Sequence, residues 1–65
     1  MTRIEEIERL RTRIAELGAL HAKNAKILAD LGRSVPAIEW VNLTYEEHIE
    51  LDQAALDALL AEELA

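Results

Sequence analysis

The sequence predicts an all-α fold: a helical hairpin of a long helix, an ordered connector and a shorter antiparallel helix, which dimerises into a four-helix bundle. Three observations predict it. Apolar residues recur every three or four positions in both halves of the chain. Only two glycines and one proline interrupt them. The 65 residues include no cysteine, so a domain this small must rely on helix packing or self-association for stability.

The first helix is predicted over residues 3–31. Thr2 and Glu5 have the spacing of a capping box, and Gly32 stands where a left-handed C-cap residue is expected. Between these ends, a coiled-coil-like seam is predicted to lie in the core or at a dimer interface. Its members are Ile7, Leu10, Ile14 and Leu17. Farther along the helix, the residues also predicted at the core or dimer interface are His21, Asn24, Leu28 and Leu31.

A second stripe of small side chains runs beside this seam from Ala15 to Ala29, through Gly18, Ala22 and Ala25. Small side chains let another backbone approach closely, so Gly18 is expected in a packed contact and not at a kink. One other helix cannot easily cover both stripes, and a homodimer is therefore predicted, with Ala22 and Ala25 also at the core or dimer interface.

Residues 32–43 are predicted to form the connector, in which Pro36 either starts a short helix over 36–41 or lies in an extended segment. Trp40 is expected to anchor it. Thr44 and Glu47 form a second capping box, which predicts a helix over residues 45–64. The apolar stripe of that helix, with Asp52 and Gln53 filling a gap in it, consists of Tyr45, Ile49, Leu56, Leu60 and Leu64. The whole chain, residues 1–65, is predicted to be a single domain.

Two polar residues, His21 and Asn24, fall inside the apolar arc of the first helix. A polar residue at such a position can fix the register and oligomeric state of a coiled coil, and partial exposure is the alternative. If His21 pairs with its own counterpart near a dimer axis, its protonation is expected to weaken the dimer at mildly acidic pH.

Charge is divided unevenly along the chain. All seven basic residues lie in residues 1–33, whereas residues 34–65 carry eight acidic residues and no Lys or Arg, and the total is −6. This balance argues against general nucleic-acid binding, since phosphate contacts need basic side chains. It favours docking onto a basic protein surface, or it serves solubility alone.

No catalytic or metal site is predicted. His48 and Asp52 share a helix face, but two ligands are too few for a closed site and the segment around them is expected to be solvated. Leu10-Arg11-x-x-Ile14 resembles the first helix of chorismate mutases, which implies arginines that bind a dicarboxylate. The later basic residues of that family have no counterpart in the acidic second half. We therefore expect no enzymatic activity and no cofactor.

These observations predict a non-catalytic protein-binding module, an acidic adaptor or inhibitor of the type of phage-encoded inhibitors and anti-activators of bacterial regulators or DNA-binding proteins. Two alternatives stay open: an assembly subunit of a larger complex, and a dimeric nucleic-acid-binding regulator. With neither a membrane span nor a signal peptide, a cytoplasmic location is predicted. The residues predicted to contact a partner are Trp40, Tyr45, Glu46, Glu50, Asp57 and Glu62.

Overall fold

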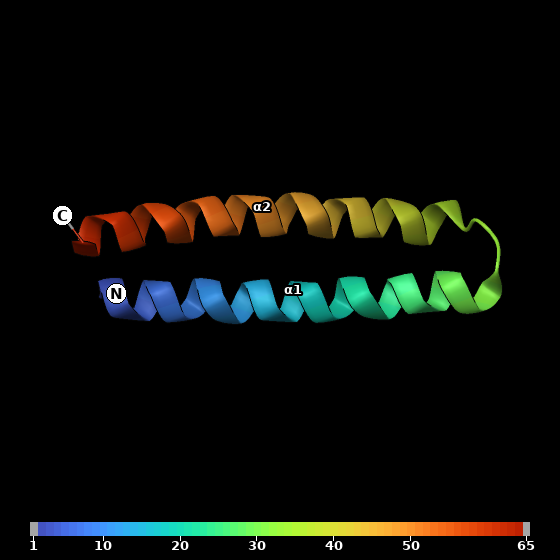
Figure 1. Cartoon of the computed structure of the whole chain (residues 1–65), viewed down its shortest axis with the longest axis horizontal. Coiled ribbons are helices and arrows are strands. Elements are labelled where there is room, and N and C mark those ends of the chain that lie inside the picture. The colour runs from blue at the N-terminus through green and yellow to red at the C-terminus, as the bar shows by residue number, and fades with distance from the viewer. Residues whose placement is uncertain (1, 65) are drawn as a thin grey trace.

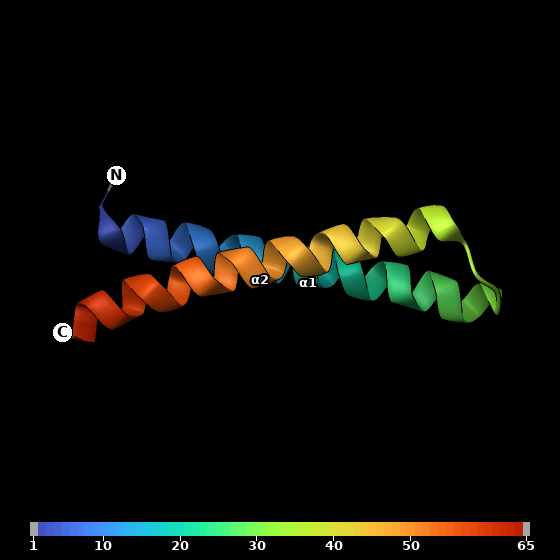
Figure 2. The same cartoon turned by 90° about the horizontal axis from the view of Figure 1, so that it is seen from above.

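The computed structural model describes residues 2–64, which form two helices of equal length. Helix α1 spans Arg3–Leu31 and helix α2 spans Pro36–Leu64, each with 29 residues. The helices run antiparallel and side by side, and residues 32–35 join them at one end (Figure 1). Seen from above, they cross near their middles (Figure 2). The all-α hairpin is thus confirmed. Met1 and Ala65 of the predicted domain, and the side chain of Leu64, lie outside the described part.

Helix α1 begins and ends where the sequence predicts. The Thr2 side chain accepts a hydrogen bond from the Glu5 backbone N–H at 3.1 Å. At the other end, Gly32 has left-handed backbone angles, with φ 63°, and its N–H donates to the carbonyls of Leu28 and Ala29 at 3.1 and 3.2 Å. Both ends are fixed by contacts within a few residues, which is why the local sequence predicts them.

Helix α2 is longer than predicted, and the connector is shorter. The predicted connector 32–43 is wrong, because the helix already begins at Pro36 and the proposed short helix 36–41 is its first part. Pro36 suits the first turn, where its missing N–H costs nothing. The carbonyl of Val35 accepts from Ile38 N–H at 3.0 Å and from Glu39 N–H at 3.1 Å, which closes that turn. The second helix is therefore not the shorter one.

The predicted start at residue 45 is wrong because Thr44 is not an N-cap. Thr44 lies inside α2, and its Oγ1 donates to the backbone carbonyl of Trp40, four residues earlier, at 3.1 Å. A mid-helix threonine commonly bonds in this way. The spacing of Thr44 and Glu47 matches a capping box, but the backbone before Thr44 is already helical.

One continuous seam joins the two helices. On both helices its residues are separated by alternating steps of three and four, as in an antiparallel coiled coil. All of its members are buried or half-buried. On α1 they are Ile7, Leu10, Ile14, Leu17, His21, Asn24 and Leu28, and on α2 they are Ile38, Asn42, Tyr45, Ile49, Asp52, Leu56 and Leu59.

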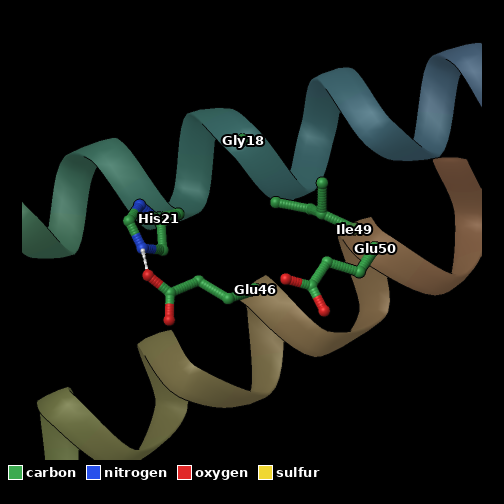
Figure 3. A pocket seen from close by; sticks show the side chains of 5 residues that line it. All are labelled: Gly18, His21, Glu46, Ile49 and Glu50. Atoms are coloured by element: carbon green, nitrogen blue, oxygen red, sulfur yellow. Dashed lines mark hydrogen bonds and ion pairs between the residues drawn. The ribbon is translucent and has the colours of Figure 1, made fainter.

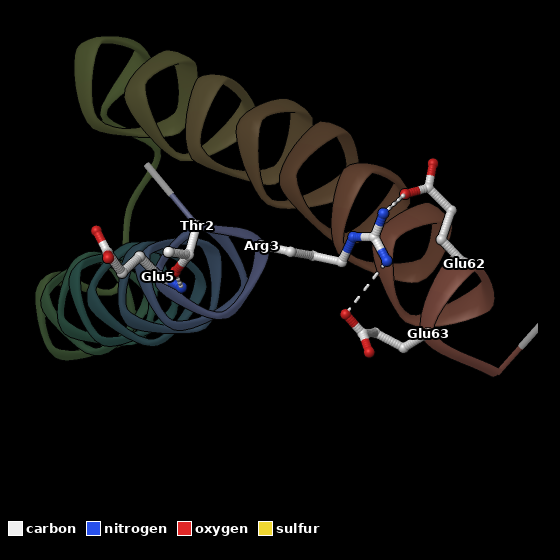
Figure 4. A network of polar contacts seen from close by, with 5 residues as sticks. All are labelled: Thr2, Arg3, Glu5, Glu62 and Glu63. Carbon is white, nitrogen blue, oxygen red and sulfur yellow. Dashed lines mark hydrogen bonds and ion pairs between the residues drawn. The ribbon is translucent and has the colours of Figure 1, made fainter.

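The apolar core lies in the half of the hairpin next to the two chain ends. The buried apolar side chains of the described residues are Ile7, Leu10 and Leu56, against which Ile14, Leu59 and Leu60 pack. At the open end Arg3 lies 3.4 Å from both Glu62 and Glu63 (Figure 4). Toward the turn, the seam contains His21, Asn24 and Asn42 in place of apolar residues.

The hairpin is thin and exposes much surface. It measures 48 × 17 × 14 Å. Its accessible surface is 4838 Å², whereas a compact monomer of 7.3 kDa is expected to expose about 4,200 Å². In the described part of the chain, neither helix has an apolar stretch long enough to cross a lipid bilayer.

Candidate protein-binding faces

The hairpin has two broad faces, one on each side of the plane that contains both helices. Gly18 lines a depression together with Glu46 and Glu50, so these residues of α1 and α2 lie on the same side. Because the seam repeats every seven residues, residues that are seven positions apart on one helix lie on the same side of the hairpin. The side so defined, here called the acidic face, comprises Arg11, Ala15, Gly18, Ala22, Ala25 and Ala29 of α1 and Glu39, Leu43, Glu46, Glu50 and Asp57 of α2.

The opposite side is assigned by the same spacing and is here called the apolar face. It comprises Leu20 and Ile27 of α1 and Val41, Thr44, His48, Leu51 and Ala55 of α2, and Glu16, Lys23 and Asp30 of α1 flank it. Toward the chain ends this side continues with Arg13 of α1, which reaches Asp52 of α2, and with Glu62, which Arg3 contacts. The two faces therefore differ in chemistry as well as in position.

The depression on the acidic face is open and has a volume of about 470 Å³. It is lined by Gly18, His21, Glu46, Ile49 and Glu50 (Figure 3). His21 of α1 and Glu46 of α2 point toward each other, with Nε2 of the ring 3.0 Å from Oε1 of the carboxylate. The lining offers an imidazole and two carboxylates beside an apolar side chain.

The contact with Glu46 bears on the predicted role of His21. The sequence-based hypothesis pairs His21 with its own counterpart in a second copy. The structure directs the ring to Glu46 of the same chain.

The stripe of small residues has no neighbour within the hairpin. Among the described residues, no atom of α2 lies within 4 Å of the position that a β-carbon on Gly18 would take, and Ala22 and Ala25 are exposed. The close packing predicted at Gly18 is therefore not supplied by α2. The helix also continues through Gly18 without interruption.

We expect Gly18→Ala to raise the free energy of unfolding by about 1 kcal/mol, because alanine is a better helix former and nothing obstructs its methyl group. Urea unfolding followed by circular dichroism at fixed protein concentration measures the change. Ala19→Gly, at the exposed neighbouring position, is the matched control and should lower stability by a similar amount. A loss of stability in Gly18→Ala would contradict the open space seen beside Gly18.

Two polar side chains of α2, Asn42 and Asp52, are each only 8% exposed. Nδ2 of Asn42 donates to the backbone carbonyl of His21 at 3.3 Å, and its Oδ1 has no hydrogen-bond partner within the described part of the chain. Oδ2 of Asp52 lies 3.2 Å from Nε of Arg13, which makes the two an ion pair. The N–H of Arg13 is not aimed at this oxygen, so the contact is not a hydrogen bond. The predicted solvation of the segment around His48 is thus wrong for Asp52.

The sequence-based prediction places neither buried residue in the core. It puts Asn42 in the connector and Asp52 in a solvated gap of the apolar stripe. Extending the seam of α2 backward from Tyr45 in steps of three and four leads to Asn42 and then to Ile38. That spacing is the signal that would have placed Asn42 in the seam.

The predicted interface residues of α1 divide into two groups. Ile7 and Leu10 are buried in the hairpin core, and five of the others are half-buried along the seam that faces α2: Ile14, Leu17, His21, Asn24 and Leu28. Leu31, Ala22 and Ala25 remain exposed. The first group packs within one chain, so only the second is available to a partner.

The predicted partner-contact residues do not form one patch. Glu46, Glu50 and Asp57 share the acidic face and are exposed. Tyr45 is half-buried in the seam, and Glu62 lies on the other side beside Arg3. Trp40 is largely exposed on the side of α2 that points away from α1. The structure therefore brings together only the three carboxylates.

Several basic side chains of α1 pair with carboxylates of the same chain. Arg13 contacts Asp52, and Arg3 contacts Glu62 and Glu63. Arg9 donates hydrogen bonds to both carboxylate oxygens of Glu6, and these bonds hold the pKa of Glu6 below its ordinary value. These pairs occupy arginines that phosphate contacts would need.

The comparisons with known proteins give no family. No protein-family model matches the chain, and neither the curated proteins nor the solved structures that were compared with it provide a match. Among residues 2–64, no three His, Asp or Glu side chains are grouped to hold a metal ion.

Proposed function

We propose that this protein is a non-catalytic protein-binding module, a small adaptor or inhibitor that docks its acidic face on a basic surface of another protein. We further propose that two copies associate into a four-helix bundle. The observation that carries the docking proposal is the position of three exposed carboxylates, Glu46, Glu50 and Asp57, on the side of the hairpin that also carries the small residues of α1.

The charge of α2 supports a basic partner. Residues 36–64 carry eight acidic side chains and no Lys or Arg. Such an excess attracts a positively charged surface over roughly 10 Å at physiological ionic strength and speeds its association. On the acidic face, Glu46 and Glu50 line the depression of about 470 Å³, and a side chain of the partner can bind in it.

The small residues of α1 supply the second half of the docking surface. Ala15, Ala22, Ala25 and Ala29 are exposed, and the space beside Gly18 is open. A helix of the partner can approach the α1 backbone closely there while its Lys or Arg side chains reach Glu46 and Glu50. The surface therefore suits a basic helix better than a flat sheet.

An assembly subunit is the second candidate, and the outward side of α2 favours it. Trp40 and Leu43 are both exposed on α2, away from the core of the hairpin. Such large apolar side chains at a surface mark contacts with other proteins when they are grouped. Light scattering distinguishes the two candidates, since a subunit without its complex is expected to aggregate and a self-sufficient dimer is not.

Charge reversal tests the acidic face. We expect the double variant Glu46→Lys/Glu50→Lys, immobilised and exposed to cell lysate, to recover the specific partners of the natural chain with a yield lowered ~10-fold or more. The matched control is Glu5→Lys/Glu47→Lys, which makes the same change in net charge at exposed positions on the outward sides of α1 and α2, away from both faces. Equal recovery by the two double variants would remove the acidic face from the proposal.

A further inference from the structure

We infer that two copies pack through their apolar faces with their hairpin turns at the same end, so that α1 of each copy lies on α2 of the other. This inference rests on the dimer of the proposed function and specifies its surface and its orientation. Four observations carry it: where the exposed apolar side chains lie, how their sizes alternate, how charge is divided between the helices, and how large the face is.

Three exposed apolar side chains of this face lie where the hairpin lacks a core of its own. Leu20 is 45% exposed, Ile27 37% and Val41 39%, and all three are in the half near the turn. The buried side chains Ile7, Leu10 and Leu56 are in the other half. Lys23 and Asp30 flank the three apolar side chains on α1, so a second copy can cover the apolar centre and leave these charges at the rim.

The sizes of the side chains on this face suit a second copy. Helix α1 contributes Leu20 and Ile27, and near the turn α2 contributes the smaller side chains Val41 and Thr44 together with His48. A two-fold axis along the length of the hairpin places α1 of one copy over α2 of the other. Leu20 and Ile27 then face the part of α2 that carries Val41 and Thr44, on both halves of the interface.

Charge favours the same axis. Residues 3–31 carry six basic and five acidic side chains, whereas residues 36–64 carry eight acidic and none basic. With the turns at the same end, each acidic α2 lies on the weakly basic α1 of the other copy. A two-fold axis across the hairpin instead lays α2 on α2, which brings the two acidic helices together. It also separates the apolar halves to opposite ends.

The face is large enough for a stable dimer. A broad side of the hairpin measures 48 by 17 Å, or about 800 Å² in projection, against the ~800 Å² of accessible surface that each partner contributes to a standard interface; this area includes the half near the chain ends, where Arg13 pairs with Asp52. The accessible surface of 4838 Å² exceeds the roughly 4,200 Å² expected of a compact monomer, which leaves additional surface for a second copy to cover. The acidic face on the other side remains free in this arrangement.

The surface is tested by sedimentation equilibrium of two matched variants. We expect Ile27→Glu to weaken the dimer roughly 100-fold, because a carboxylate at the interface loses its hydration. Leu43→Glu adds the same charge at a position that is 52% exposed on the opposite, acidic side of α2, seven residues before Glu50, and it should change the dimer affinity little. Circular dichroism checks that both variants remain helical. A monomeric natural chain, or equal weakening by both variants, would overturn the proposed surface.

The orientation is tested on the full chain without altering the face. The sequence has no cysteine, so Arg33→Cys in the connector accepts a single spin label. Turns at the same end place the two labels of a dimer well within the 48 Å length of the hairpin, and a distance of that length or more would overturn the orientation. A chain that stays monomeric yet loses its partners upon charge reversal at Glu46 and Glu50 would refute this dimer while supporting the acidic docking face.

Discussion

Leu10→Ala should lower the free energy of unfolding by about 3 kcal/mol and leave much of the chain unfolded at room temperature. Leu10 is the most buried side chain of the core, with 3% of its surface exposed, and its removal leaves a cavity against Ile7 and Leu56. A core in a domain of this size rarely contributes more than ~3–5 kcal/mol, so a loss of this size consumes most of the stability.

The measurement is the helical signal in circular dichroism together with a urea titration at fixed protein concentration. Leu43→Ala is the matched control, because it deletes the same atoms from a side chain that is 52% exposed. We expect that control to unfold close to the natural chain. A cooperative transition at the natural midpoint in Leu10→Ala would show that the core is not where the hairpin places it.

Asp52→Leu should raise the free energy of unfolding by about 1–3 kcal/mol. Asp52 occupies a seam position between Ile49 and Leu56, is 8% exposed, and has Arg13 as its ion-pair partner. Replacing a buried carboxylate by an apolar side chain removes its desolvation cost, and a buried leucine contributes about 1.5–3 kcal/mol of its own. The freed guanidinium of Arg13 is 44% exposed and stays hydrated.

Thermal and urea unfolding of Asp52→Leu are compared with Asp57→Leu, where the same exchange is made on the exposed acidic face. The control should change stability little. Arg13→Ala should destabilise, because it leaves the carboxylate of Asp52 buried and unpaired. If Asp52→Leu were instead less stable than the natural chain, the ion pair with Arg13 would have to stabilise the fold more than an apolar contact does.

Polar residues in the seam have a consequence for specificity. Asn42 and Asp52 each bind one group of α1, the backbone carbonyl of His21 and the side chain of Arg13. An antiparallel pair that slips by one turn loses both contacts and buries both polar groups without partners. These residues therefore oppose alternative registers even where they add little to stability.

The sequence by itself determined the helical class, the hairpin and both ends of α1. Thr2 and Gly32 act through hydrogen bonds to residues close in the chain, so their effect is readable without a partner helix. The sequence does not determine where α2 begins, because it contains two signals for a helix N-terminus: the capping-box spacing of Thr44 and Glu47, and the proline at position 36.

Only the tertiary structure decided which polar residues are buried and which surfaces are free. The burial of Asn42 and Asp52 depends on α1 lying against them. Helical periodicity marks which positions of α2 face α1, but it does not predict that a carboxylate is buried at one of them. The same holds for the position of Glu46 beside Gly18 and His21, since residues 25 or more apart meet through the register of two helices. Local propensity acts along one helix, whereas burial is a property of the pair.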